Sequence, residues 1–369
     1  MIRVEILKIS RSGLKPFVML PFKLYEGDPN WVPPLISAQL KALTAPQQDP
    51  RRFFMVYKDD QPVARVMAGV NHKLNERLGK KYGYLSLFEC AQSPDYARAV
   101  LDAACGYLRE LGMEMVIGPN SPTQDDLTKG LLIQGYEGPP VMLNAYNPPY
   151  YVEYFEKCGF VKHRDHFAYY MRMDEFNTHK VEEIVPRAMR RFGFRVEHVN
   201  FTKENEGKLL RDITRIIQEA FPQEWELSVP THEDIARVYE MMRRYYRPEM
   251  TVIAYAGNRP IGFVAAFPDY NQVLKKMKGR VLPIGWLKFL FGKGKISGAR
   301  CNMQFVVPEY QLKGVNTVMF YEAFMGAQRM GIKWVEGSPV DETNVASINN
   351  TERAGSHLYR IYRQYEKEL

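Results

Sequence analysis

The chain has 369 residues, of which 46% are hydrophobic and 25% are charged. This composition is typical of a folded protein of about two domains and excludes general disorder. Its four cysteines show no CxxC spacing, which excludes a disulfide-stapled scaffold, and we expect no metal site. The 50 basic residues exceed the 42 acidic residues and give a net charge of +8, which favours an anionic ligand, a nucleic acid or a membrane surface as partner.

The first half of the sequence alternates between runs that predict strands and runs that predict helices. Its clearest helix begins at Ser93-Pro94-Asp95, where serine suits the N-cap and proline the first helical position. Apolar residues then recur at helical spacing until Gly112. The predicted elements are strands at 4–9, 53–58, 63–70, 84–91, 113–118 and 160–173, short helices within 14–34, and helices at 94–111 and 150–157.

The second half repeats this order of elements. Strands are predicted at 194–202, 251–256, 261–267, 299–307, 334–336 and 358–365, and helices at 206–221, 232–247, 315–330 and 344–353. We therefore predict an α/β (α+β) fold with two tandem copies of one domain, each a mixed central sheet flanked by helices. The domains are expected at 1–174 and 175–369, joined by the charged segment 174–193.

The positive charge is concentrated in one segment of the second half. Residues 1–174 carry a net charge of only +2, whereas residues 270–308 contain eight basic residues and no acidic ones. Within that segment, residues 281–291 are mostly apolar and aromatic. The segment 275–295 is interpreted either as a packed lid or as a peripheral membrane contact. Nucleic acid is not expected, because no nucleic-acid-binding motif is present.

No targeting or membrane-spanning segment is visible in the sequence. The N-terminal residues MIRVEILKIS alternate like a strand and lack the apolar core of a signal peptide. No uninterrupted apolar stretch approaches the roughly 20 residues that span a bilayer. We expect a cytoplasmic protein.

The segment after the strand at 299–307 carries a recognisable motif, Val306-Val307-Pro308-Glu309-Tyr310-Gln311-Leu312-Lys313-Gly314-Val315-Asn316. It resembles the acyl-CoA signature of the GNAT acyltransferases, V-x-P-x-[YF] followed by [QR]-x-x-G-x-[GA], except that Asn316 replaces Gly or Ala. Asn344 resembles the family asparagine that faces the CoA arm, and the whole chain resembles bacterial tandem GNAT-like proteins. The resemblance implies that acetyl-CoA or another acyl-CoA contacts Val306, Val307, Gln311, Leu312, Lys313, Gly314, Val315, Asn316 and Asn344.

The same motif makes physical sense as a phosphate site. A strand that runs through a glycine turn into a helix exposes free backbone N–H groups, and the helix dipole favours a pyrophosphate there. Gly314 lets the backbone approach a phosphate closely, and Lys313 adds positive charge. At the equivalent place in the first half, Ser93 is expected to cap the helix, Pro94 lacks an N–H group and Asp95 is negative. We therefore predict that the first half is a degenerate copy that does not bind CoA phosphates.

Acyl transfer to an amine requires a general base and a general acid. The resemblance implies a tyrosine acid four residues before the helix-ending glycine, but Phe155 and Thr351 stand there. Tyr359 is therefore the candidate acid, with Tyr362 an alternative on the same strand. Glu336 is the candidate base, against the interpretation of a paired structural carboxylate, and the nearby His357 is a weaker candidate.

The long segment 118–149 separates two predicted elements of the first half. It contains Asn120, Asn144 and Tyr146 among prolines and glycines. Long polar loops in compact domains are often functional. We expect these three residues to line the acceptor site, against the alternative of a structural cover.

The leading hypothesis is an N-acyltransferase that moves an acyl group, expected to be acetyl, from acyl-CoA to a small-molecule or amino-acid amine. A long-chain N-acyl amino acid synthase and a Fem-type aminoacyl transferase are alternatives with related folds. The alternative of another class is a non-catalytic protein that binds acyl-CoA or a membrane. The missing tyrosine and Asn316 favour that last alternative.

Overall fold

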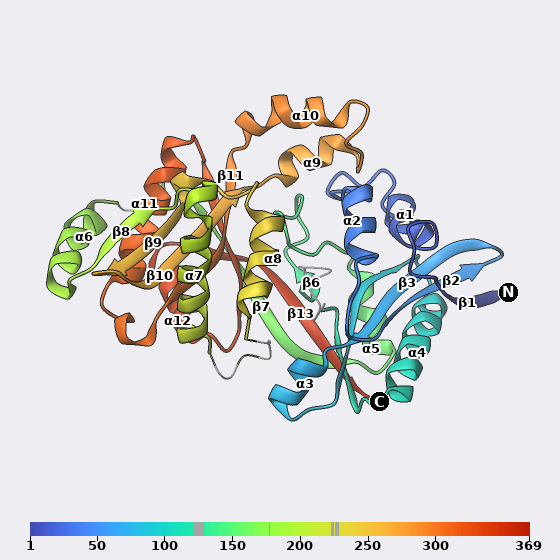
Figure 1. Ribbon diagram of the computed structural model, residues 1–369. Helices are drawn as coiled ribbons and strands as arrows, with labels where there is room; N and C mark the ends of the chain where they lie inside the picture. The colour runs from blue at the N-terminus through green and yellow to red at the C-terminus, as the bar shows by residue number, and fades with distance from the viewer. Residues whose placement is uncertain (121–128, 177, 223–224, 226–228) are drawn as a thin grey trace.

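A computed structural model describes residues 1–120, 129–176, 178–222, 225 and 229–369. In this part of the chain, thirteen strands form a single mixed sheet, in the order β1-β2-β3-β4-β5-β13-β7-β12-β11-β10-β9-β8, with β6 paired to β13 (Figure 1). The strands are β1 (Ile2–Ile6), β2 (Arg51–Lys58), β3 (Gln61–Val70), β4 (Tyr82–Cys90), β5 (Met115–Gly118), β6 (Leu131–Gln134), β7 (Val161–Arg172), β8 (Arg195–His198), β9 (Thr251–Ala256), β10 (Arg259–Pro268), β11 (Gly298–Val306), β12 (Trp334–Asp341) and β13 (His357–Glu368).

The last strands of the two halves lie in the middle of this sheet and join the halves. β13 runs antiparallel to β5 of the first half and to β7. β7 in turn runs antiparallel to β12 of the second half. The final strand of the chain therefore completes the sheet of the first half, and β7 lies between the two strands that end the second half.

Helices cover both faces of the sheet. In the second half α7 and α8 lie on one face and α11 and α12 on the other (Figure 1). The helices are α1 (Lys15–Leu24), α2 (Ile36–Leu43), α3 (His72–Leu78), α4 (Pro94–Glu110), α5 (Tyr150–Lys157), α6 (Thr178–Phe192), α7 (Lys203–Ala220), α8 (His232–Met242), α9 (Asn271–Met277), α10 (Gly285–Gly292), α11 (Val315–Arg329) and α12 (Val345–Arg353). None of the helices, as far as the chain is described, is long and apolar enough to cross a membrane.

Local sequence signals explain several helix ends. Thr231 and Asp234 form a reciprocal capping box at the start of α8, in which each backbone N–H donates to the other side chain, at 3.0 and 3.2 Å. α4 begins at Pro94 with Ser93 as N-cap residue, as predicted. The Ser93 hydroxyl, however, makes no capping hydrogen bond.

The predicted α/β class and most predicted elements are confirmed, and the differences have physical causes. The segment expected as a charged linker contains helix α6, whose Val185 and Ala188 pack into the core of the second half. The charged residues that suggest a linker lie on the exposed face of α6, which is an amphipathic helix. The sequence prediction also missed α2, α3, β6, α9 and α10, which are all short.

Candidate functional site

Two neighbouring parallel strands diverge in the middle of the second half. β11 and β12 pair from Gly298 to Cys301 and from Trp334 to Gly337. Beyond those residues β11 continues to pair with β10, and β12 with β7. The first half contains the same opening, because β4 and β5 pair in parallel only over Tyr82–Tyr84 and Met115–Ile117.

A cavity of about 1000 Å³ occupies this region and is lined by residues from both halves. This volume is at the upper end of the range for small-molecule sites. On the side of α7 and α8, apolar side chains line it: Ile217, Phe221, Trp225, Val238, Met242 and Phe305. A second apolar group lines it from the side of α6 and α11: Met171, Phe176, Val181, Phe320 and Val335. Tyr84, Ile117 and Asn120 extend the lining into the opening of the first half.

The motif of residues 306–316 forms the turn that leads into α11. Gly314 is the N-cap residue, with a φ of 79° that favours glycine, and an added Cβ would lie 3.0 Å from the Cβ of Ala188. No side chain caps this helix, so its first N–H groups are available to a ligand. Asn316 and Thr317, in the first turn of α11, line the cavity. A helix N-terminus without a side-chain cap therefore opens directly onto the cavity.

The other predicted CoA-contacting residues are distributed around this turn. The Gln311 amide donates to the Val306 carbonyl at 3.1 Å and so holds the turn closed. Lys313 lies over the Tyr310 ring, 4.8 Å from its centroid, and Leu312 is fully exposed. Val307 and Val315 are buried in the core. The buried valines thus fix the turn to the core, while the Lys313 charge and the backbone of the turn lie towards the surface.

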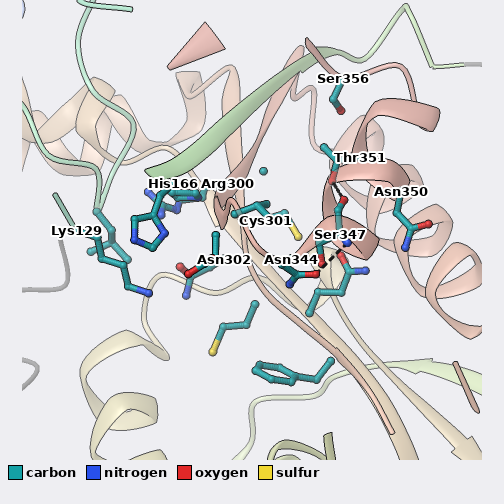
Figure 2. Close-up of a pocket in the computed structure, with 18 of the residues that line it drawn as sticks. Lys129, His166, Arg300, Cys301, Asn302, Asn344, Ser347, Asn350, Thr351 and Ser356 are labelled. Carbon is teal, nitrogen blue, oxygen red and sulfur yellow. Dashed lines mark hydrogen bonds between the residues drawn. The ribbon is translucent and has the colours of Figure 1, made fainter. Parts of the chain in front are cut away.

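Helix α12 forms a polar wall of the cavity (Figure 2). Asn344 caps this helix by accepting from the Ser347 N–H at 3.1 Å. Ser347, Asn350 and Thr351 from the same helix also line the cavity. The Asn344 side chain thus lies in the wall where the sequence predicted a contact with the CoA arm.

Facing this wall, three neighbouring strands present a row of titratable side chains. His166 on β7 lies directly opposite Tyr362 on β13 and Asp341 on β12, and all three line the cavity. The Asp341 carboxylate is held by Arg164 at 3.1 Å and by Thr343 at 2.7 Å. His166 and Tyr362 are buried, and His166 Nε2 and the Tyr362 hydroxyl make no hydrogen bond of good geometry with the described residues, although Gln364 lies beside His166 and Arg360 beside Tyr362. Buried polar atoms without such a hydrogen bond are unusual in folded proteins and mark a place where a ligand can bind.

Burial sets the protonation states of this row. Desolvation lowers the pKa of His166 to about 4, so that its imidazole is neutral at pH 7. Desolvation raises the pKa of Tyr362 well above its usual value, so that the phenol keeps its proton. Lys129, whose pKa is also lowered by burial, lies on the same side of the cavity as His166 (Figure 2). The row therefore combines a neutral imidazole with a protonated phenol.

Glu336 and Tyr359, the residues predicted from the sequence as base and acid, do not line the cavity. The Tyr359 hydroxyl donates to Glu336, whose two oxygens also accept from the Asn144 amide at 2.9 Å. Arg300 lies 3.7 Å from the same carboxylate. Glu336 is completely buried, and its neighbours Val335 and Gly337 line the cavity instead, because successive strand residues point to opposite faces. This geometry supports the structural interpretation of a paired carboxylate.

The three residues predicted for the acceptor site have different positions. Asn120 and Asn144 line the cavity. Tyr146 does not, and its hydroxyl donates to Asp28 at 2.7 Å. Residues 121–128 of the same predicted loop lie outside the described part of the chain.

Comparisons with solved structures decide the fold. A tandem GNAT protein from the clavulanic acid biosynthesis pathway superposes with a TM-score of 0.61 at 11% identity, over 100% of this chain and 98% of its own. A GCN5-related N-acetyltransferase from Sphaerobacter thermophilus superposes with a TM-score of 0.57 at 12% identity, over 100% and 95% of the two chains. This chain has the tandem GNAT fold. The predicted resemblance is thereby confirmed at the level of the fold.

Two curated proteins also align with this tandem GNAT-fold chain over nearly its whole length. Protein YghO of Escherichia coli is 27% identical and covers 98% of this chain and 94% of its own length. A protein named bacterial ceramide synthase, from Caulobacter vibrioides, is 26% identical and covers 97% and 95%. No protein-family model matches the sequence.

The tandem GNAT fold explains why sequence reasoning missed His166. The residue lies within a predicted strand without any surrounding motif. Its place beside Tyr362 depends on β13 pairing with β7, two strands that are far apart in the sequence. The period-two pattern of β7 sorts its residues into two faces, but it does not show which of these faces borders the cavity.

Proposed function

We propose that this protein is an N-acyltransferase that joins a long-chain acyl group from acyl-CoA to an amine that carries an alkyl chain of its own. The observation that carries the proposal is the cavity, in which one apolar region lies on each face of the sheet and both meet where β11 and β12 diverge. An acetyl group, expected from the sequence, would leave most of this apolar surface uncovered. The Caulobacter vibrioides relative supports the proposal by its name, because a ceramide is an amide of a fatty acid and a long-chain amino alcohol.

The fold suggests where each part of the substrates would bind. The CoA pyrophosphate would bind the free N–H groups at the start of α11, beside Lys313. The pantetheine arm would follow the polar wall of α12 past Asn344. The acyl chain would then occupy the apolar region near Phe176 and Phe320, and the chain of the amine the region near Val238 and Met242.

His166 and Tyr362 are the acid–base pair that we propose for the reaction. The amine nitrogen attacks the thioester carbonyl, a C–N bond forms and the C–S bond breaks. Neutral His166 accepts the proton that the amine loses through Nε2, and Tyr362 donates its hydroxyl proton to the departing CoA thiolate. Neither atom makes a hydrogen bond of good geometry in the described structure, and both residues border the cavity.

Release of the CoA thiol by the purified full-length protein tests the function. Acyl-CoA substrates of two, eight and sixteen carbons are combined with amines of low and high alkyl content. We expect the fastest release with the longest acyl chain and a long-chain amino alcohol, and little release with acetyl-CoA. Release with acetyl-CoA and small amines alone would contradict the chain-length proposal. Binding of acyl-CoA without release from any pair would identify a non-catalytic binding protein.

Lys313→Glu tests the phosphate site separately. It replaces a half-buried positive charge beside the proposed pyrophosphate, so we expect KM for acyl-CoA to rise about tenfold while kcat changes little. Lys80→Glu makes the same change at an exposed position in the first half and is the control. Equal KM values in the two variants would argue against binding at this turn.

A further inference from the structure

Helices α9 and α10 form an arm that is fixed firmly to the rest of the molecule. The Phe289 ring stacks on the fully buried Tyr270, with centroids 5.8 Å apart. Val273 and Met277 are buried beneath the arm. At the turn between the helices, the Gly279 carbonyl accepts from the backbone N–H of Ile36 at 3.0 Å. The arm is therefore an ordered part of the surface.

The outer side of this arm is strongly apolar. α10 lies at the periphery of the molecule, with α9 between it and α2 (Figure 1). Leu282 and Phe291 are 72% exposed, Ile284 58%, Leu290 48% and Trp286 47%. Trp286 and Leu290 are four residues apart in α10 and so share a face. Five large apolar side chains exposed within residues 282–291 are a concentration that is rare on monomeric proteins and marks an interaction site.

Positive charge surrounds this apolar surface. The exposed basic residues of the arm are Lys276, Lys278, Arg280, Lys288, Lys293 and Lys295. None of them lies within 4.0 Å of a carboxylate in the described part of the chain. The sequence between residues 270 and 308 contains no acidic residue at all. The arm therefore presents unneutralised cations around exposed tryptophan, leucine and phenylalanine side chains.

We propose that residues 275–295, the α9–α10 surface, dock onto an anionic lipid bilayer. Trp286, Leu290 and Phe291 would enter the interface between headgroups and acyl chains, and the lysines would contact the anionic headgroups. The arrangement suits this partner better than two others. Nucleic acid offers no apolar phase for five large apolar side chains, and a second copy of this chain would bring like charges together. The proposal does not depend on the reaction proposed above.

Co-flotation of the full-length protein with vesicles tests the proposal. We expect binding to vesicles of phosphatidylcholine with phosphatidylglycerol, weakened by salt, and little binding to phosphatidylcholine alone. A triple variant Trp286→Ser, Leu290→Ser, Phe291→Ser should lose at least tenfold in binding. The control triple variant Ile2→Ser, Val4→Ser, Ile6→Ser removes comparable exposed apolar residues from β1 and should bind like the wild type.

Two further measurements separate the lipid from other partners. Quenching of tryptophan fluorescence by lipids with brominated acyl chains should disappear in Trp286→Phe although binding persists, since only Trp286 would enter the bilayer. Lys276→Glu with Lys293→Glu should weaken binding to anionic vesicles, whereas Lys80→Glu with Lys203→Glu should not. No binding to anionic vesicles would overturn the proposal. Dimerisation or RNA binding that the serine triple variant abolishes, without vesicle binding, would also overturn it.

Discussion

Two tyrosines of β13 are chemically alike but differ in their position relative to the cavity. The hydroxyls of Tyr362 and Tyr365 are both buried, and neither makes a hydrogen bond of good geometry with the described residues. Only Tyr362 lines the cavity. Tyr362 borders the site, whereas Tyr365 packs into the core of the first half. The pair therefore offers a matched test of the proposed acid.

Tyr362→Phe is expected to lower kcat by about 100-fold or more, the usual contribution of a general acid. Its free energy of unfolding should stay equal or rise slightly, because the lost hydroxyl is buried and makes no well-formed hydrogen bond. Tyr365→Phe should leave kcat unchanged. Steady-state thiol release and urea unfolding of the three proteins measure both quantities, and equal kcat values would remove Tyr362 from the mechanism.

His166 makes the stability of the protein depend on pH. Its pKa is lowered to about 4 in the folded state by burial, compared with 6.5 when unfolded. Between about pH 6.5 and 4 the unfolded chain therefore binds a proton at this imidazole that the folded chain does not bind. The free energy of unfolding falls as the pH drops through this range, by up to about 3 kcal/mol from this residue.

His166→Gln removes this titration. The loss of unfolding free energy between pH 7 and pH 4 should be smaller in the variant than in the wild type, as measured by urea unfolding at both values. Asp269, whose pKa burial raises to about 6, titrates with the opposite sign and is present in both proteins, so the difference isolates His166. An identical loss in both proteins would show that the imidazole is not held neutral.

At the scale of elements, α7 and α8 decide how much room the site has on one face of the sheet. Val238 is half-buried in α8 and contributes to the apolar lining of the cavity. Its side chain points into the region that we propose for the alkyl chain of the amine. The length of that chain should therefore be set by the side chains of α8.

Val238→Trp should fill part of this region. We expect kcat/KM for a long-chain amine to fall about tenfold, with little change for short-chain amines or in KM for acyl-CoA. Val161→Trp adds the same bulk at an exposed position on β7 and serves as control. If chain-length preference is unchanged, the amine does not bind against α8.

At the scale of the whole molecule, the exchange of final strands joins the two halves into one sheet. β13 buries Tyr362 and Tyr365 and pairs with β5, β6 and β7. Each large buried side chain contributes about 1.5–3 kcal/mol, so loss of this strand is comparable with the total stability of a domain, about 5–15 kcal/mol. The first expected domain, residues 1–174, lacks β13, and the second, residues 175–369, lacks β7, so we expect neither to fold independently.

A fragment of residues 1–174 is expected not to form a stable monomer, because β5 and β7 would lack the strand between them. Size-exclusion chromatography and circular dichroism test this, and co-expression with residues 175–369 should restore a soluble complex. A fragment that is monomeric and unfolds as cooperatively as the full-length chain would show that β13 is dispensable for the first half.

The sequence alone determined the order of elements, the tandem repeat, the turn at Gly314 and the concentration of positive charge in residues 270–308. These follow from local periodicity, from glycine and proline chemistry and from composition, which require no knowledge of distant contacts. Only the tertiary structure decided that Glu336 is buried away from the cavity and that His166 and Tyr362 border it. The reason is that β13 pairs with β5 and β7, which are far from it in the sequence. A period-two pattern shows that the residues of a strand alternate between two faces, but not which face borders the cavity.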